Sequence, residues 1–406
     1  MDVPLVVARR ALASEKHSYV LFAYRETKSS KPALVETDLG DTVPDHLSKY
    51  LVSYPLNPAN GRRTDVPSHL RTLVVIDSTV SGTHRSSDVY FAVLAPLLKA
   101  FDLPHVYVAT TGPHTIPNHA SSFSSSSTVV FLAGDTSVHE FVNSLQPQTS
   151  SASMTVAIIP TGTGNAISES LGRTNGIADA ISRLFLGSPN PLQAMKVGFG
   201  QGSTLATTGA PVSQLQSLVV TSWGFHASIV ADSDEPEARK QGAARFQVAA
   251  HHNLTVPQDY KGTVSYRTRS WLGGSSQHKL EGPHSYVLFT FMTSLEKGFV
   301  ISPKGDLSKL FLVHFNYTDN NSDRIMEIMK AAYNKGSHID LSDVTYQECD
   351  TASANGDSPI AQISITDSDP RHHRVCVDGR IVNVKDKVEL FTPSATYKGW
   401  RLFIVS

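Results

Sequence analysis

The sequence predicts two fold classes in one chain: an α/β region with an open parallel sheet, followed by a mainly antiparallel β region. Between residues 70 and 195, short apolar runs typical of buried strands alternate with segments whose apolar residues recur every three or four positions. Beyond residue 195, most strand-like runs follow one another without a long helix between them. Hydrophobic residues make up 40% of the 406 residues, which is enough to fill the cores of such domains.

The α/β region carries four apolar runs that predict buried strands, at residues 73–76, 105–109, 128–132 and 156–159. The spacing of the apolar residues between and after them predicts helices over 89–101, 138–145 and 166–186. This alternation favours a parallel sheet, because each parallel crossover needs a connection long enough to hold a helix.

The parts before and after this region have other patterns. Residues 1–69 contain one clear strand signal, at 18–24, and we predict a small N-terminal extension. The later strand signals lie at 218–221, 262–267, 286–291, 309–314, 374–377 and 388–391. One helical pattern, 323–334, interrupts them, and residues 350–370, rich in Ser, Asp and Gly, are predicted to be a loop.

Charge and cysteine content exclude several classes of function. Lys and Arg total 35 against 36 Asp and Glu, a formal net charge of −1, which gives no bulk attraction to nucleic acid. Two cysteines rule out a disulfide scaffold and a cysteine-based zinc site. No apolar run reaches the roughly 18 residues of a membrane span, and the N-terminus lacks a signal-peptide pattern. We expect a cytoplasmic protein that binds no nucleic acid.

The sharpest local feature is the segment Pro160–Asn165, which reads Pro-Thr-Gly-Thr-Gly-Asn between a predicted strand and a predicted helix. Two closely spaced glycines let the backbone approach a bulky anion, and a helix N-terminus offers unpaired N–H groups. The segment therefore fits a phosphate cradle. The alternative is a glycine-rich turn in which Asn165 caps the helix and no ligand binds.

Polar loops also follow two other predicted strands: Ser78–Thr83 after the first, and Gly134-Asp135-Thr136 after the strand at 128–132. Ligands of open α/β sheets bind at the carboxyl ends of strands, so Asp135 is placed to meet a metal or a hydroxyl proton. The alternative is that Asp135 only caps the next helix.

Two arginines, Arg239 and Arg245, follow the segment Trp223-Gly224-Phe225. Guanidinium groups suit phosphate oxygens through paired hydrogen bonds. The alternative is that both arginines lie on a solvated surface.

Taken in order, these segments resemble the diacylglycerol kinase catalytic family, and within it sphingosine kinases and related fungal lipid kinases. The segments that carry the resemblance are Asn118–Ala120, Gly134–Asn143, Pro160–Ala166, Trp223–Phe225 with Arg239–Phe246, Val300–Pro303 and Val377–Gly379. They are similar, in that order, to the family's N-H-A, G-D-G-x-x-H-E-V-V-N, P-x-G-[ST]-G-N-A, W-G-F…R-x-x-G-x-x-R-F, I-S-P and V-D-G-E elements. The match runs from about residue 73 to the end of the chain.

The resemblance implies a nucleotide-binding domain of the phosphofructokinase and NAD kinase type over residues 70–195, and a lipid-binding antiparallel β-sandwich over 196–406. The implied reaction is transfer of the γ-phosphate of ATP, with Mg²⁺, to the primary hydroxyl of a long-chain sphingoid base or a diacylglycerol-like lipid. Such a substrate implies transient, peripheral contact with intracellular membranes. The oligomeric state stays open, with a homodimer as one option.

The resemblance also implies roles for individual residues. Asp135 would be the general base that takes the proton of the lipid hydroxyl. The nucleotide phosphates would be held by Ser78, Gly82, Gly134, Gly162, Thr163, Gly164 and Asn165. Glu140 and Asp378 would border the nucleotide, and Arg239 and Arg245 would neutralise phosphate charge. Metal ligands are left unassigned.

Several positions differ from the family's pattern. The first loop begins with Ser78-Thr79 in place of the family's Asn-Pro. Thr136 stands at the second glycine of G-D-G, and Arg380 stands at the acidic residue after D-G. Ser228 stands where sphingosine kinases carry an aspartate for the lipid head group. These differences leave two functions open: an active lipid kinase, and a catalytically weakened member that binds nucleotide or lipid without efficient turnover.

Overall fold

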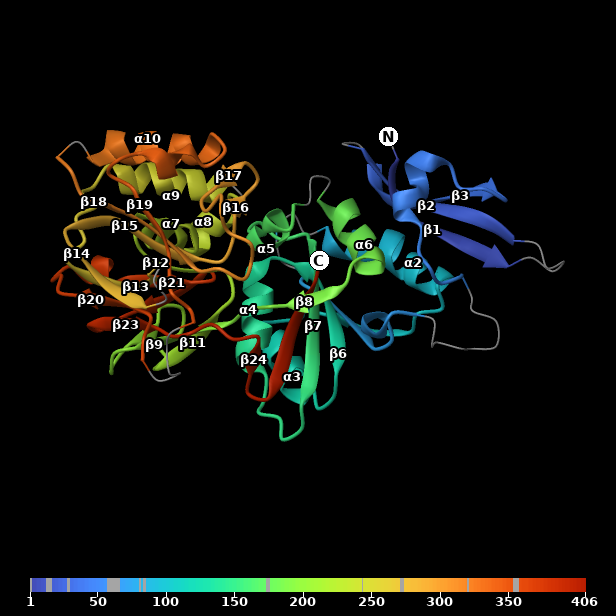
Figure 1. Ribbon diagram of the computed structural model, residues 1–406, viewed down its shortest axis with the longest axis horizontal. Helices are drawn as coiled ribbons and strands as arrows, with labels where there is room; N and C mark the ends of the chain where they lie inside the picture. Colours follow the sequence, from blue (N-terminus) through green and yellow to red (C-terminus); the bar gives the residue numbers. More distant parts are fainter. Residues whose placement is uncertain are drawn as a thin grey trace. The chain divides into compact units, whose positions relative to one another are not determined.

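The structure is a computed structural model of the chain. It describes residues 2–11, 17–27, 30–56, 66–79, 82, 85–172, 176–242, 244–270, 274–319, 321–352 and 358–406. The chain divides into two compact units (Figure 1). Unit 1 comprises Met1–Thr163, Leu171–Pro191 and Thr396–Ser406, and unit 2 comprises Gly164–Ser170 and Leu192–Ala395.

A mostly parallel sheet of strand order β24-β25-β7-β6-β4-β5 forms the centre of unit 1. Its strands are β4 (Leu73–Asp77), β5 (His105–Ala109), β6 (Ser127–Ala133), β7 (Ala152–Pro160), β24 (Thr396–Tyr397) and β25 (Trp400–Val405), with β8 (Pro189–Pro191) paired to β25. All neighbouring pairs from β25 to β5 are parallel, and only β8 and β24 pair antiparallel. The predicted parallel sheet is therefore confirmed.

Helices cover this sheet: α1 (Ser86–Val89), a π-helical segment (Tyr90–Leu94), α2 (Ala95–Ala100), α3 (Thr115–Ser122), α4 (Asp135–Ser144) and α6 (Ile177–Leu186). Apolar side chains of α2 and α6 share one core with β4, β6 and β7. Phe141 of α4 packs edge-on against Phe131 of β6, with ring centroids 5.4 Å apart. No helix in the described part of the chain is both long and apolar enough to cross a membrane.

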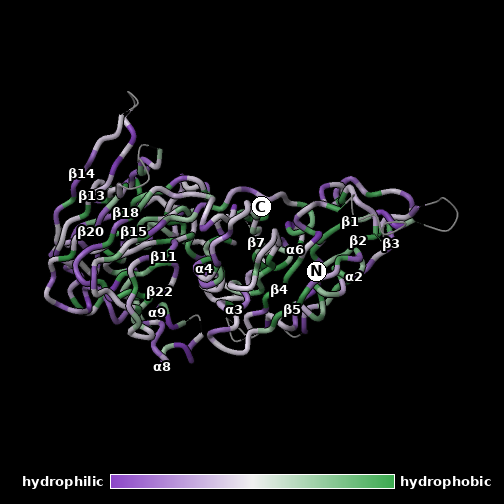
Figure 2. Tube along the Cα trace, turned by 90° about the horizontal axis from the view of Figure 1, so that it is seen from below, coloured by the Kyte–Doolittle hydropathy of each residue, from purple (hydrophilic) through white to green (hydrophobic). Residues whose placement is uncertain are grey.

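The first residues form a three-stranded antiparallel sheet, β1 (Val3–Ala11), β2 (His17–Thr27) and β3 (Ser30–Gly40). Phe22 of β2 contacts Phe101 just after α2, and both rings lie in the core that contains α2 and α6. Figure 2 shows the hydrophobic residues that run along β1 and β2. The sequence pattern predicts only the strand at 18–24, because the other two strands depend on packing against a distant helix layer.

Unit 2 contains two antiparallel sheets. The seven-stranded sheet has the order β10 (Thr204–Leu205), β22 (Arg380–Asn383), β21 (Arg374–Val377), β12 (Val220–Gly224), β15 (His284–Thr290), β18 (Phe311–Asn316), β19 (Thr345–Glu348). The six-stranded sheet has the order β11 (Gln214–Ser217), β9 (Met195–Phe199), β23 (Lys387–Leu390), β20 (Ala361–Ile365), β13 (Gly262–Arg269), β14 (Ser275–Glu281). Smaller elements are β16 (Ser294–Glu296), β17 (Phe299–Val300), α5 (Ala166–Ser170), α7 (Phe225–Ser233), α8 (Pro236–Arg239), α9 (Ala244–Leu254) and α10 (Asn321–Tyr333).

The two sheets of unit 2 meet at Trp223. Its fully buried ring lies 3.0 Å from the position that a Cβ at Gly262 would occupy, so only a glycine lets β13 approach this ring. The mainly antiparallel character predicted for this region is confirmed.

Two segments lie elsewhere than predicted. β20 falls inside residues 350–370, which were predicted to be a loop; its five residues alternate buried and half-buried side chains between β13 and β23. β25, close to the end of the chain, pairs with β7 in unit 1 and not with the strands of unit 2. The compact units therefore do not follow the predicted boundaries at 69/70 and 195/196, since the last strand returns to the first sheet.

Two buried histidines, His284 and His314, form a direct hydrogen bond between β15 and β18, with Nδ1 and Nε2 2.9 Å apart. Nε2 of His284 also lies 3.2 Å from the Gly262 carbonyl, which only accepts, so this nitrogen carries the proton. Nδ1 of His284 then accepts from Nε2–H of His314, and both rings are neutral. Burial lowers the pKa of His314 to about 3 and also lowers the pKa of His284.

This pair makes unit 2 sensitive to acid. Near pH 6.5 these histidines bind protons in the unfolded chain but stay neutral in the folded chain. Their contribution to stability is therefore complete above that pH and is lost as the pH falls towards the folded pKa values. Between pH 6 and pH 5 the free energy of unfolding of unit 2 decreases, and we expect this decrease to be about 1 kcal/mol smaller in His314→Gln. Hydrogen exchange of β15 and β18 measures it. His251→Gln at the surface is the control, and parallel pH curves for His314→Gln and the wild type would contradict the expectation.

Candidate active site at the strand ends of unit 1

The carboxyl ends of β4, β6 and β7 bring three predicted polar loops to one edge of the unit 1 sheet. In the parallel register Asp77 of β4 lies beside Leu132 of β6, and Ala133 of β6 lies beside Pro160 of β7. The backbone N–H of Ser78 donates to the Leu132 carbonyl at 3.0 Å, which ties the first loop to β6. Parallel strands place their carboxyl ends together, and the loops therefore meet as predicted.

Gly162 packs directly on Gly134. A Cβ added at Gly162 would lie 2.6 Å from the Gly134 Cα and 2.5 Å from its nitrogen, closer than real contacts allow. Gly82, with φ of 59°, approaches the Thr161 carbonyl so closely that a Cβ there would also collide. Glycine is therefore required at these positions for the backbones of the three loops to pack directly against one another. Val80 and Ser81, within the first predicted loop, lie outside the described residues.

Asp135 is the first residue of α4, next to this glycine contact. Gly134 occupies the N-cap position in an extended conformation, so Asp135 is the first residue within the helix and not its N-cap residue. The Asp135 side chain is buried, and the first turn of a ten-residue helix favours its negative charge. Thr136 is exposed, so its side chain does not fill the space around the glycines, and Glu140 is half-buried one turn later on α4.

Asp77 is a residue of this edge that the sequence analysis missed. It is fully buried, and its Oδ2 accepts hydrogen bonds from Ser87 Oγ at 2.7 Å and Tyr107 Oη at 2.6 Å. Its Oδ1 is buried, and so is Oγ1 of Thr161, and neither oxygen has a hydrogen-bond partner among the described residues. A carboxylate that ends the apolar run Leu73–Ile76 was the signal that could have identified it.

The second half of the Thr-Gly-Thr-Gly-Asn segment belongs to unit 2. The division between the units falls between Thr163 and Gly164. Asn165 precedes α5, and its carbonyl accepts the first helical hydrogen bond from Glu169 at 2.9 Å. Ser170, at the end of α5, accepts from the backbone N–H of Ser294 and donates to its carbonyl, which fastens this short helix to β16.

Arg239 and Arg245 lie in unit 2 and share one carboxylate. Nη2 of Arg239 contacts Asp234 at 2.8 Å, and Nη2 of Arg245 lies 4.0 Å from the other oxygen of Asp234. Nε of Arg245 is buried without a partner, and burial lowers the pKa of this guanidinium while Asp234 raises it. Two cations against one anion leave a net positive charge that fits an anionic ligand.

Asp378 is held inside unit 2. With φ of 51° it forms, with Gly379, the two-residue turn between β21 and β22 that an Asp-Gly pair favours. Its carboxylate accepts from four donors at 2.6 to 2.9 Å: Ser217 Oγ and the backbone N–H groups of Leu218, Val219 and Val220. This arrangement favours a structural role over the nucleotide-bordering role implied by the resemblance. Arg380 begins β22 and is half-buried.

Ser228 of α7 lies in a polar cluster of unit 2. Its Oγ is 2.6 Å from Tyr260 Oη, and Nη2 of Arg374 donates to it at 3.2 Å. Arg374 also contacts Asp232, one turn later on α7, at 2.5 Å, and Asn253 of α9 donates to the other oxygen of Asp232 at 2.7 Å. The nearest carboxylate to Ser228 on α7 is therefore neutralised within the protein.

Known proteins resemble this chain in sequence and in fold. Residues 71–197 match the diacylglycerol kinase catalytic domain. Human sphingosine kinase 2 is 27% identical over 150 residues, which cover 34% of this chain and 21% of that protein. The matched segment thus spans about a fifth of the length of this relative.

Solved structures extend the likeness of fold to most of the chain. A candidate diacylglycerol kinase from Bacillus anthracis str. Sterne superposes with a TM-score of 0.55 at 15% identity, covering 87% of this chain and 98% of that one. A second structure with the same description and source gives a TM-score of 0.53 at 14% identity, covering 84% and 98%. Similarity at this level shows a shared fold. Residues 71–197 therefore match the diacylglycerol kinase catalytic domain family, and most of the chain shares the fold of these two structures.

Proposed function

We propose that the protein is an ATP-dependent lipid kinase that phosphorylates the primary hydroxyl of a sphingoid base or a diacylglycerol-like lipid. The observation that carries the proposal is the packing of Gly134 on Gly162, which sets the Asp135 carboxylate beside a glycine-rich loop at one strand edge. Phosphoryl transfer depends on positioning and charge neutralisation more than on covalent help, and this edge supplies both. The family, whose members are generally lipid kinases, supports the same reaction.

In the proposed reaction, Asp135 accepts the proton of the lipid hydroxyl. The hydroxyl oxygen forms a bond to the γ-phosphorus of ATP, the bond from that phosphorus to the bridging oxygen breaks, and ADP leaves. The backbone of Ser78, Gly82, Gly134, Gly162 and Thr163 would hold the phosphates. The α4 N-terminus adds a positive partial charge.

The family resemblance suggests nucleotide-binding roles for further residues. Gly164 and Asn165 continue the glycine-rich loop, Arg239 and Arg245 would neutralise phosphate charge, and Glu140 of unit 1 would border the nucleotide.

The strand edge also fits a divalent cation. Asp77 Oδ1 is a buried oxygen with no hydrogen-bond partner among the described residues, and a carboxylate oxygen suits Mg²⁺ together with nucleotide phosphates. Mg²⁺ would neutralise the charge of the transferring phosphoryl group. Asp77 is the side chain that would hold it.

A catalytically weakened family member is the second candidate. Arg380 favours it, because a cation replaces the acidic residue of the family's V-D-G-E element. Such a protein would bind ATP or lipid without efficient turnover.

Incubation with γ-labelled ATP, Mg²⁺ and a panel of sphingoid bases and diacylglycerols separates the two candidates. Labelled lipid is the expected result, and the panel shows which alcohol accepts the phosphate. Measurable ATP binding without any labelled lipid would contradict the proposal and support the weakened member.

Gly162→Ala tests the loop contact. The added Cβ would force Gly162 away from Gly134, and a shift of about 1 Å at reacting groups lowers kcat/KM by about 100-fold. Gly112→Ala is the matched control in unit 1, because no atom lies within 4 Å of its added Cβ. Equal kinetics for the two variants would show that the contact is dispensable.

A further inference from the structure

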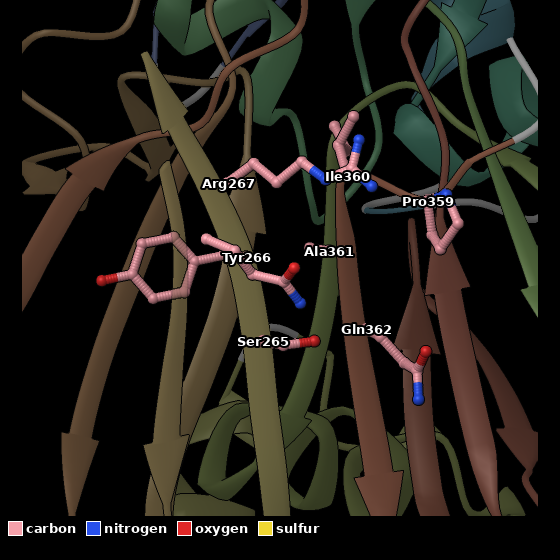
Figure 3. A pocket seen from close by; sticks show the side chains of 8 residues that line it. Ser265, Tyr266, Arg267, Pro359, Ile360, Ala361 and Gln362 are labelled. Carbon is pink, nitrogen blue, oxygen red and sulfur yellow. The ribbon is translucent and has the colours of Figure 1, made fainter. Parts of the chain in front are cut away.

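A small polar hollow lies on the six-stranded sheet of unit 2, between β13, β14 and β20 (Figure 3). It has a volume of about 70 Å³ and is lined by the side chains of Ser265, Arg267, Gln277 and Gln362, with Pro359 and Ile360 at one end. This volume is well below that of sites for drug-sized molecules, so the hollow suits a single small group.

The lining residues present donors on one face of the sheet. Ser265 and Arg267 are two positions apart on β13, so they share a face, and Figure 3 shows Tyr266 pointing away from it. Gln277 of β14 lies opposite Arg267, and Gln362 of β20 lies opposite Ser265. One guanidinium, one hydroxyl and two amides therefore surround the hollow, and none of the described residues that line it carries a carboxylate; the amide of Gln362 also donates to Ser364 Oγ at 2.9 Å.

Arg267 differs from its cationic neighbours on this sheet. Lys279 contacts Glu281 at 2.7 Å, and Lys387 contacts Glu389 at 3.3 Å. The guanidinium of Arg267 forms neither an ion pair nor a hydrogen bond with any part of the chain that the structure describes.

The backbone of Arg267 is nevertheless held in place. Its N–H donates to the Ile360 carbonyl at 3.0 Å, and its carbonyl accepts from Asp350 at 2.8 Å. A half-buried cation that is held in place and has no anionic partner among the described residues can bind an external anion.

We propose that this hollow is a binding site for a phosphate monoester, with Arg267 as its anchor. A tetrahedral phosphate offers three terminal oxygens, which match the fork of a guanidinium plus the hydroxyl and amide donors. The phosphate belongs either to the head group of an anionic lipid in a membrane or to a soluble compound. The site is in unit 2 and uses none of the residues proposed for phosphoryl transfer.

Two charge-matched variants test the site. Arg267→Gln and Lys279→Gln each remove one positive charge from the same sheet, but only the first removes the anchor. Binding of inorganic phosphate and of a water-soluble short-chain phosphatidic acid is followed through the backbone amide NMR signals of β13, β14 and β20. We expect Arg267→Gln to weaken binding by about tenfold or more, and Lys279→Gln to change it less than about twofold.

Vesicles identify the source of the phosphate. Flotation of the wild type with phosphatidylcholine vesicles that contain phosphatidic acid, lost in Arg267→Gln, assigns the site to a lipid head group. Binding of the soluble probes without flotation assigns it to a soluble phosphate compound. Both outcomes support the site.

Two results would overturn the site: equal loss in both variants, which indicates diffuse charge attraction, and no response of these amides in the wild type. Kinase activity is assayed separately in detergent micelles and should be the same in Arg267→Gln as in the wild type. A wild type without kinase activity would reject the proposed function and leave the binding test intact.

Discussion

Asp135→Asn is expected to lower the rate of lipid phosphorylation by about three orders of magnitude while ATP affinity changes less than about threefold. Asparagine has the shape of aspartate but accepts no proton at neutral pH, so the hydroxyl of the lipid keeps its proton in the transition state. The backbone of Gly134 and Gly162, which would hold the phosphates, is unchanged. Turnover is measured with γ-labelled ATP, and affinity by calorimetric titration.

A surface carboxylate of the same unit provides the control for this variant. Asp102 is exposed just after α2, and its φ of 50° is a conformation that asparagine adopts readily. Asp102→Asn should therefore leave turnover and folding as they are. Full turnover in Asp135→Asn would remove the proposed base, and a parallel loss of ATP affinity would assign Asp135 to binding instead.

Asp378→Ala is expected to destabilise unit 2 by about 3–5 kcal/mol. The substitution leaves three buried backbone N–H groups and the Ser217 hydroxyl without their acceptor, and each buried group left without a partner costs about 1–3 kcal/mol. Alanine is also disfavoured at the positive φ of this turn. Urea unfolding, followed by hydrogen exchange of β12 and β21, measures the change.

Asp378→Asn separates the structural role from a nucleotide role. Asparagine tolerates the turn and keeps one acceptor oxygen, so we expect a loss between the wild type and Asp378→Ala. Unchanged stability together with a raised KM for ATP would contradict the structural role and restore the place beside the nucleotide that the resemblance implies.

Local sequence patterns were enough to predict the class of the two regions and the residues of the glycine-rich edge. Apolar runs and helical spacing are local patterns, and they identified β4 to β7 without any knowledge of their partners. Gly134, Asp135 and Gly162 could be predicted as site residues from the polar loops that follow two strand patterns. Loops that follow parallel strands of one sheet meet at the same edge.

Only the tertiary structure decided how distant segments pair. The N-terminal sheet was underestimated because its stabilising contact is with Phe101, far along the chain. β25 pairs with β7 although most of unit 2 lies between them in the sequence, and no pattern near residue 400 predicts this pairing. The hydrogen-bond partners of Asp77 and Asp378 could not be predicted either, because the sequence does not show which donors lie near a carboxylate. In the folded chain the Asp378 carboxylate accepts four hydrogen bonds, whereas one oxygen of Asp77 accepts none from the described residues.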